Sequence, residues 1–365
     1  MKIAIEAHRI FRARKHGMDF VVLEMLRCLQ KIDKENEYYV FTAGGPDRCL
    51  KETRNFHIID MRVPGYALWE QVFLPLAVRK IKPDILHCTS NTAPLFPGCK
   101  NLILTLHDVI FLEKVGGVNP SLYQKLGRVY RRMIVPAVIK KSTSIVTVSN
   151  YEKRRIVETA GVPEDKIVTV YNGYSTKFRS KGTAQKYLFF LGNTDPKKNT
   201  AGTLAAYAIY LQKSMLKLPL WIADLSIENV RKIAASISHE EILDHIKCLG
   251  YVKNTDLPKI YNGCMAFLYT SLRESFGIPS LEAMACGAPV VASNSSAIPE
   301  ILGEGALLVD PKNPADIASA LLRLETDVTF RKNVSEYGLE RVKLYSWENT
   351  AKAYLDLYLK VGNSL

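Results

Sequence analysis

The chain has 365 residues, of which 47% are hydrophobic and 23% charged, with a formal net charge of +13. This composition is that of an ordinary globular protein, and the length predicts two domains, because one hydrophobic core rarely serves so many residues. No apolar run approaches the roughly 20 residues that a membrane-spanning helix needs. Residues 1–7 are too short for a signal peptide and predict a first β-strand instead.

The seven cysteines argue against an oxidising compartment. None forms a C-x-x-C pair, and Cys88, Cys264 and Cys286 lie in apolar strand or helix contexts. This pattern predicts buried free thiols in the cytoplasm, and neither disulfides nor metal ligands.

The positive charge is concentrated in the first half of the chain. Residues 1–175 hold 27 Lys and Arg against 17 Asp and Glu, whereas the remainder holds 22 against 19. Such an excess suits nucleic acid, an anionic membrane surface or an acceptor that carries phosphate. No recognised nucleic-acid motif accompanies the charge, so the sequence does not predict a nucleic-acid partner.

Apolar strands alternate with amphipathic helical stretches along the whole chain, which predicts an α/β protein with parallel sheets covered on both faces. The strands of the first half are expected at residues 2–7, 38–42, 57–63, 84–89, 102–107, 144–149 and 167–171. Those of the second half are expected at residues 187–191, 218–223, 247–249, 266–270, 289–293 and 306–309. Helices are expected at residues 20–32, 69–80, 121–141 and 151–160.

A polar, non-periodic segment at residues 175–185 predicts the linker between the domains. The expected domains are therefore residues 1–175 and 176–345, with a last amphipathic helix in residues 346–365. Ligands of doubly wound sheets bind beyond the carboxyl ends of the strands, so the functional residues are expected on those loops.

The stretch at residues 271–294 carries the clearest chemical signal. Glu274 follows an apolar strand, Gly277 lies in a turn, a helix begins near Pro279, and Glu282 falls about one turn inside that helix. The helix N-terminus suits a diphosphate, and the two carboxylates suit hydroxyl groups on either side of it. A nucleotide-sugar has this layout, whereas the alternative is an ordinary βαβ crossover with a capping glutamate.

A second candidate phosphate site follows the strand at residues 187–191. Gly192 permits close approach of a ligand, and Lys198 supplies positive charge before the next helix.

The run from Glu274 to Val291 closely resembles the E-x7-E signature of retaining glycosyltransferases of family 4, the group 1 glycosyltransferases. These are GT-B enzymes that use nucleotide-sugar donors without a metal. The resemblance implies two doubly wound, Rossmann-like domains that face each other across a cleft. It also implies that the last helix crosses back to the first domain.

The resemblance also assigns roles to particular residues. It implies that Glu274 holds hydroxyls of the transferred sugar, that Glu282 holds the ribose, and that Lys198 offsets the charge of the leaving diphosphate. Catalytic residues by this resemblance are His107, Glu274 and Lys198. The implied donor-binding residues are Gly17, Gly192, Asn193, Lys197, Lys198, Tyr251, Val252, Glu274, Ser275, Phe276, Gly277, Ile278 and Glu282. His87 and Asp108 are candidates for contact with the acceptor.

Two positions depart from the family pattern. Asn193 stands where an arginine is common, and Ser275 stands where glycine is more frequent. These departures are the only support for a second hypothesis, a catalytically silent subunit that binds nucleotide-sugars for a partner enzyme.

The leading hypothesis is a retaining, metal-independent hexosyltransferase that acts in polysaccharide or lipopolysaccharide biosynthesis. It expects a UDP- or GDP-sugar as co-substrate, no cofactor, no metal, and a glycan or lipid-linked acceptor. The Lys198-Asn199 pair favours mannose as the hexose. The basic helix at residues 121–141, with Lys125, Arg128 and Arg132 on one side, predicts peripheral binding to the cytoplasmic face of a membrane. The alternative for that helix is a solvated surface.

Overall fold

A computed structural model describes residues 1–112, 122–182 and 186–363. For residues 122–124 it describes the backbone alone. The chain divides into two compact units. Unit 1 comprises Met1–Gly173 and Ser346–Leu365, and unit 2 comprises Tyr174–Tyr345. The first boundary falls two residues before the expected one. The expected helix start at residue 121 and the end of the expected linker, residues 183–185, lie outside the described residues.

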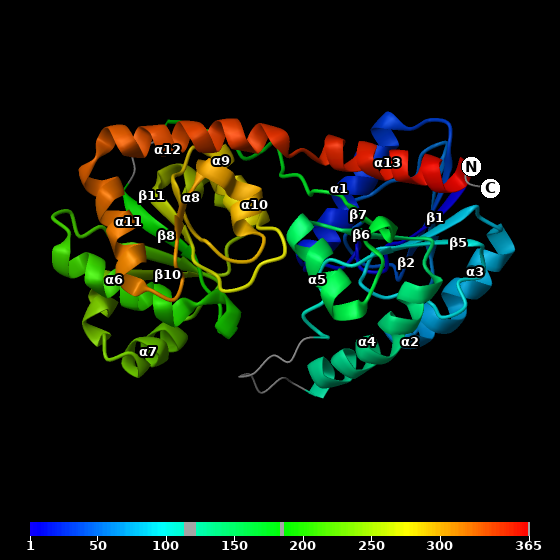
Figure 1. The fold of residues 1–365 in the computed structure, drawn as a ribbon, viewed down its shortest axis with the longest axis horizontal. Coiled ribbons are helices and arrows are strands. Elements are labelled where there is room, and N and C mark those ends of the chain that lie inside the picture. The colour runs from blue at the N-terminus through cyan, green and yellow to red at the C-terminus, as the bar shows by residue number, and fades with distance from the viewer. Residues whose placement is uncertain (113–121, 183–185, 364–365) are drawn as a thin grey trace. The chain divides into compact units, whose positions relative to one another are not determined.

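Unit 1 is built on a parallel sheet that has, over the described residues, seven strands in the order β3-β2-β1-β4-β5-β6-β7 (Figure 1). The strands are β1 (Lys2–Glu6), β2 (Glu37–Thr42), β3 (Phe56–Asp60), β4 (Ile85–Cys88), β5 (Asn101–Thr105), β6 (Ser144–Thr147) and β7 (Ile167–Thr169). Its helices are α1 (Gly17–Ile32), α2 (Tyr66–Leu68), the π-helix η1 (Trp69–Phe73), α3 (Leu74–Ile81), α4 (Leu122–Lys141), α5 (Asn150–Ala160), the 3-10 helix η2 (Glu164–Lys166) and α13 (Trp347–Asn363).

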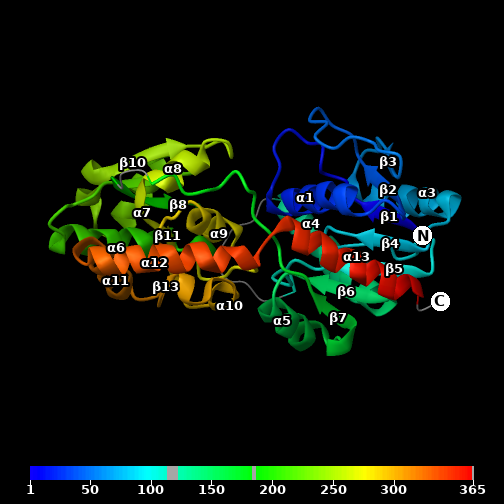
Figure 2. The ribbon, with the colours of Figure 1, turned by 90° about the horizontal axis from the view of Figure 1, so that it is seen from above.

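Side chains of the unit 1 strands alternate between two buried cores, as a parallel sheet covered on both faces requires. In β1, Ile3 and Ile5 join a core with α1 and α13, whereas Ala4 joins a core with α3 and α4. Figure 2 shows α1 and α13 side by side over the sheet. The last helix therefore completes the hydrophobic cover of unit 1, although the whole of unit 2 precedes it in the sequence.

The helical stretch expected at residues 69–80 is continuous with α2 and α3 but contains the π-helical turn η1. The Glu70 side chain is fully buried there. Its carboxylate accepts hydrogen bonds from Tyr66 (2.8 Å), Thr92 and Tyr130. These bonds compensate for the burial of a carboxylate, and the widened turn was not signalled by the hydrophobic periodicity.

Unit 2 repeats the doubly wound plan with six parallel strands, among the described residues, in the order β10-β9-β8-β11-β12-β13. The strands are β8 (Tyr187–Leu191), β9 (Leu220–Ala223), β10 (Ile246–Gly250), β11 (Cys264–Tyr269), β12 (Val290–Ser293) and β13 (Leu307–Val309). The α-helices are α6 (Thr200–Lys213), α7 (Ile227–Ser236), α8 (Leu257–Gly263), α9 (Ile278–Ala285), α10 (Ile298–Leu302), α11 (Pro314–Thr326) and α12 (Val328–Arg341). The 3-10 turns are η3 (Pro196–Lys198), η4 (Glu240–His245), η5 (Gly303–Gly305) and η6 (Val342–Leu344).

Every strand expected from the sequence is present, with ends that differ by at most a few residues. Within the part of the chain that the structure describes, no helix is both long enough and apolar enough to cross a membrane.

The chain leaves and re-enters unit 1 at one tight crossing. A Cβ atom built on Gly173 would lie 2.1 Å from the backbone nitrogen of Trp347. The Thr350 hydroxyl fixes the same crossing by donating to the carbonyl oxygen of Tyr171 at 2.8 Å. Only a residue without a side chain fits where these two backbones meet.

We expect Gly173→Ala to destabilise the protein by about 1–3 kcal/mol, because the added methyl group meets backbone atoms that cannot rotate away. Thermal unfolding measures the change. Gly127→Ala in α4 is the matched control, since its Cβ would meet only the Arg131 side chain at 3.7 Å and alanine favours helix. Equal melting temperatures for Gly173→Ala and the wild type would contradict the tight crossing.

Candidate functional site

The candidate site of unit 2 lies at the point in its sheet where the order in which the strands are added reverses, between β8 and β11. Strands β8 and β11 are parallel neighbours, whereas β9 follows β8 on the opposite side. At such a switch point the loops after the two central strands diverge and leave room for a ligand at their carboxyl ends. The loop at residues 192–199 follows β8, and the loop at residues 270–277 follows β11.

Lys198 and Glu274 meet at this edge. The Lys198 Nζ atom donates to Glu274 Oε1 at 2.5 Å, and 28% of the lysine and 14% of the glutamate side chain remain exposed. The ring centroid of Tyr269 lies 5.6 Å from Lys198 Nζ. The two side chains that the sequence assigned to sugar and diphosphate are therefore adjacent.

Backbone contacts fix the two loops to each other. The Leu272 amide donates to the Lys197 carbonyl at 2.7 Å, and the Asn199 side-chain amide donates to the Thr270 carbonyl at 3.1 Å. The Ser296 hydroxyl accepts from the Glu274 amide at 2.9 Å. Because these bonds join the two loops to each other and to Ser296, they fix the positions of Lys198 and Glu274 relative to each other.

Helix α9 begins immediately beyond Glu274, with Gly277 as its N-cap residue. Gly277 adopts φ +110°, which residues with a side chain rarely adopt, so the turn requires glycine. Phe276 is buried and packs edge-on against Tyr345, with ring centroids 5.8 Å apart, whereas Ser275 and Ile278 are partly exposed. Pro279 has no N–H and the Ser280 amide donates to the Gly277 carbonyl oxygen at 3.0 Å, so the partial positive charge of this helix start comes from the aligned peptide dipoles of α9.

Glu282 lies in the second turn of α9 and is 9% exposed. Burial raises the pKa of its carboxyl group to about 8, and Lys177 opposes that rise only partly. The carboxyl group is therefore largely protonated at neutral pH in the protein without ligand. In this form it can donate one hydrogen bond and accept others, which suits a diol.

Three further expected donor residues, Gly192, Asn193 and Lys197, lie on the loop after β8. Gly192 is buried at the end of β8, while Asn193 is exposed and its side-chain oxygen accepts from the Asp195 amide at 2.9 Å. Lys197 is exposed and forms an ion pair with Asp195 at 3.5 Å. All of these lie on the loop that carries Lys198.

Tyr251 and Val252 follow β10, and β9 separates that strand from β8. The Tyr251 side chain is 74% exposed. Tyr251 and Val252 therefore lie at the same edge of the sheet as Lys198, but two strands away from the strand that precedes Lys198.

In unit 1 the corresponding switch point lies between β1 and β4. The fully buried Glu6 carboxylate joins the two strand ends, since it accepts from the amides of His8 at 2.9 Å and Thr89 at 3.1 Å. Glu6 was not among the expected site residues. An acidic residue at the end of an otherwise apolar buried strand was the signal that could have found it.

His107 lies just beyond β5, near the same edge. Its backbone amide donates to the Asn91 side chain at 2.6 Å, and its Nε2 atom lies 3.0 Å from the Thr89 carbonyl oxygen. A carbonyl oxygen only accepts, so Nε2 carries the proton and Nδ1 keeps its lone pair. Burial lowers the pKa of His107, which favours this neutral form.

His87 does not occupy an acceptor position, contrary to its selection from the sequence. Its side chain is fully buried, with Nδ1 bonded to Tyr358 and Nε2 bonded to Thr105, each at 2.7 Å. Burial lowers the pKa of His87 to about 3. Both ring nitrogens are engaged, so His87 joins α13 to the sheet and has no nitrogen left for a substrate.

Asp108 and Gly17 have local structural roles. Asp108 accepts from the Ile110 amide at 3.1 Å, which shapes the turn after His107. Gly17 is the first residue of α1, three residues earlier than expected, because His16 and Asp19 form a capping box there. Asp19 also forms an ion pair with Arg12.

Two doubly wound units with a lysine–glutamate pair at the switch point of the second define a glycosyltransferase of the GT-B class. Residues 175–341 match the family model for glycosyl transferases group 1, and residues 16–178 match that for glycosyltransferase family 4. Together the two models span most of the chain. The chain belongs to this family of glycosyltransferases.

Similar proteins agree with this assignment. The O-antigen chain mannosyltransferase B of Escherichia coli is 28% identical over 295 residues, which cover 77% of this chain and 76% of that protein. The O-antigen chain mannosyltransferase RfbU of Salmonella typhimurium is 27% identical over 291 residues, which cover 72% and 81%. The fold resembles that of Anabaena HepE in complex with UDP-glucose, with a TM-score of 0.75, 14% identity, and coverage of 99% and 100%.

The raised pKa of Glu282 predicts a pH-dependent stability. The folded protein holds this proton up to about pH 8, whereas an unfolded glutamate releases it near 4.5, so ionisation opposes folding as the pH rises through this window. We expect Glu282→Gln to be more stable than the wild type at pH 8.5 by at least about 1 kcal/mol, and the gain to vanish near pH 4.5.

Urea unfolding of the ligand-free protein at the two pH values measures this difference. Glu304→Gln is the control, because Glu304 is exposed. A gain for Glu282→Gln that is the same at both pH values would refute the raised pKa.

Proposed function

We propose that this enzyme transfers a hexose, by the names of its relatives a mannose, from a nucleoside diphosphate sugar to a growing O-antigen-type glycan. The ion pair between Lys198 and Glu274 at the switch point of unit 2 carries this proposal. A diphosphate competes for the lysine, and sugar hydroxyls compete for the glutamate. Each partner therefore has a ready ligand when the donor binds, and neither charge is left unpaired in the empty site.

The donor is proposed to lie across the start of α9. The positive end of the α9 dipole and Lys198 would face the diphosphate, Glu274 the hexose and Glu282 the ribose hydroxyls. A Cβ atom on Gly277 would meet the side chains of Ile298 at 3.1 Å and Tyr269 at 3.4 Å, so this glycine serves the packing of the turn that leads into α9. Tyr251 and Val252, farther along the sheet edge, are the residues proposed to lie beside the base.

The proposed reaction retains the configuration of the anomeric carbon. The bond between that carbon and the diphosphate oxygen breaks, and the acceptor hydroxyl attacks from the same face. The acceptor proton passes to the leaving phosphate oxygen. His107, a neutral imidazole with a free lone pair at Nδ1, is proposed to orient the acceptor hydroxyl or the hexose and not to hold the proton as a base.

Stabilisation of the leaving diphosphate is assigned to Lys198 and the α9 dipole, since charge that develops in the transition state is best offset by fixed dipoles and cations. We propose that the reaction requires neither a metal nor a cofactor. Asn193 supplies no positive charge, so this role rests mainly on Lys198.

We expect Lys198→Gln to reduce kcat for sugar transfer about 100- to 1,000-fold, because it removes one preorganised charge from the transition state. The neighbouring Lys197→Gln is the matched control and should lose far less, since Lys197 is exposed and already paired with Asp195. A chromatographic transfer assay with GDP-mannose and UDP-sugars, with and without EDTA, measures both variants.

The assay also distinguishes the alternative function. Donor binding by thermal shift without turnover across all donors and acceptors would favour a silent nucleotide-sugar-binding subunit. Equal losses of kcat in the Lys197 and Lys198 variants would contradict the role given to Lys198.

We further propose that unit 1 binds the cytoplasmic face of an anionic membrane through α4. Helix α4 exposes Leu126 (62%), Val129 (55%) and Met133 (71%) on one face, flanked by exposed Lys125 and Arg132. Arg128 is half-buried and contributes less than the sequence predicted.

A second apolar surface adjoins this face. Leu68, Val72, Phe73 and Leu76 are exposed on the segment from α2 to α3, and the Gln71 amide of this segment donates to Tyr130 of α4 at 2.8 Å. An apolar surface with a basic margin suits the interface of an anionic bilayer.

We expect Met133→Glu to reduce sedimentation with phosphatidylglycerol vesicles at least fivefold, since it introduces an anion into the apolar face that meets lipid. Met215→Glu is the control, because Met215 is 90% exposed but lies in unit 2. Binding should also weaken between 0.05 and 0.5 M salt, a change of about 14 to 4 Å in the screening length. Equal sedimentation of the two variants would contradict the proposed surface.

A further inference from the structure

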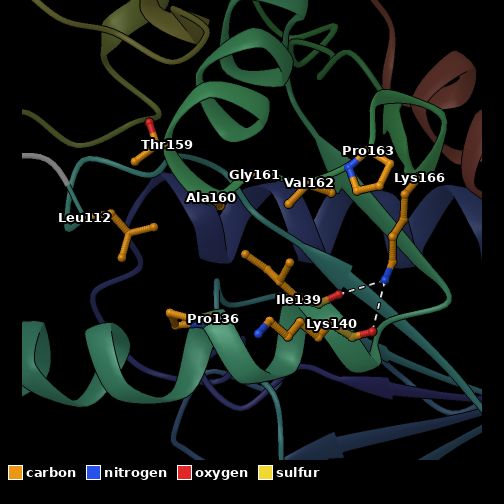
Figure 3. Close-up of a pocket in the computed structure, with 10 residues that line it drawn as sticks. All are labelled: Leu112, Pro136, Ile139, Lys140, Thr159, Ala160, Gly161, Val162, Pro163 and Lys166. Atoms are coloured by element: carbon orange, nitrogen blue, oxygen red, sulfur yellow. Dashed lines mark hydrogen bonds between the residues drawn. The ribbon is translucent and has the colours of Figure 1, made fainter.

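Unit 1 contains a pocket that neither the proposed transfer reaction nor the family assignment uses (Figure 3). It has a volume of about 380 Å³ and lies between the second half of α4 and the end of α5. The lining residues are Leu112, Pro136, Ile139, Lys140, Thr159, Ala160, Gly161, Val162, Pro163 and Lys166.

The pocket lies away from the edge of the sheet that carries His107. Helix α4 leads into the amino end of β6, and α5 with η2 leads into the amino end of β7. The ends of these helices are therefore near the amino edge, whereas the catalytic loops follow the carboxyl ends of the strands. Nine of the ten lining residues therefore come from the ends of these helices, whereas Leu112 comes from the loop that follows His107.

The lining combines apolar walls with positive charge. Leu112, Ile139 and Val162 supply aliphatic surface, and the ten lining residues include two lysines but no carboxylate. The Lys166 ammonium donates to the carbonyl oxygens of Ile139 at 2.9 Å and Lys140 at 3.2 Å, so it is committed to the end of α4. Lys140 is exposed, and Figure 3 shows its side chain extending toward Pro136. Lys140 is therefore the cation best placed to meet an anion at the mouth.

The pocket continues the exposed face of α4. Met133, Pro136 and Lys140 are exposed at spacings of three and four residues, which places them on one side of the helix. The apolar face formed by Leu126, Val129 and Met133 thus leads directly to the pocket.

We propose that this pocket receives one hydrocarbon chain of an anionic membrane phospholipid, with the lipid phosphate beside Lys140. At about 380 Å³ the pocket is far larger than the space that one water molecule needs, so it admits a segment of an acyl chain. This inference rests on the membrane contact proposed above and adds a specific lipid site to it. Insertion of one chain would give unit 1 a fixed attachment point in addition to its diffuse electrostatic attraction to the bilayer.

The test uses the full-length protein and lysophosphatidylglycerol with a twelve-carbon chain, below its critical micelle concentration and without a sugar donor. Titration calorimetry should show saturable binding to one site. Ala160→Phe fills the pocket and should weaken binding at least tenfold, whereas Lys140→Glu should weaken it about fivefold. Ala235→Phe and Lys232→Glu, both at exposed positions of α7 in unit 2, are matched controls and should bind like the wild type.

Three results would overturn the proposal: undiminished binding by Ala160→Phe, equal binding of an uncharged twelve-carbon monoglyceride, or tighter binding of farnesyl phosphate. The last result would identify an isoprenoid carrier as the occupant. If Ala160→Phe melts at a lower temperature than the wild type, Thr159→Phe on the same wall replaces it. Transfer to a soluble acceptor should be unchanged in Ala160→Phe, so failure of the lipid site and failure of the transferase function are separable.

Discussion

The ion pair between Lys198 and Glu274 is the interaction on which the catalytic interpretation depends. Opposite charges at the ends of two neighbouring parallel strands stabilise each other while the site is empty. Bonds from Leu272 and Asn199 hold the two loops at this separation. The site is therefore organised before a donor arrives, and little conformational freedom remains to be lost when the donor binds.

In unit 1, a part of the chain that is distant in sequence completes the hydrophobic core. Helix α13 covers one face of the seven-stranded sheet, and Tyr358 satisfies the buried ring of His87. Gly173 and Trp347 meet where the chain leaves and returns to this unit. Stability of unit 1 is thus coupled to the C-terminal residues, since without α13 an apolar face and a buried imidazole would lack their partners.

Helix α4 has three different environments along its surface. Its inner side packs in the core through Val135 and Val138. Tyr130 reaches the buried carboxylate of Glu70, while Met133 and its neighbours remain exposed. The exposed apolar side chains of this helix and the two lysines of the adjoining pocket are the observations on which the proposed lipid contact rests.

The two parallel sheets and their strands could be predicted from the amino-acid sequence, because short apolar runs separated by amphipathic helices permit few other arrangements. The amino-acid sequence also indicated Glu274, Glu282 and Lys198 as candidate donor-binding residues, from their residue types, their spacing and the family resemblance that they carry. That His87 is a core residue and that Glu6 joins two strand ends could be seen only in the folded chain. Both outcomes depend on which strands become neighbours and on which distant side chain reaches a buried polar group, and local sequence contains neither.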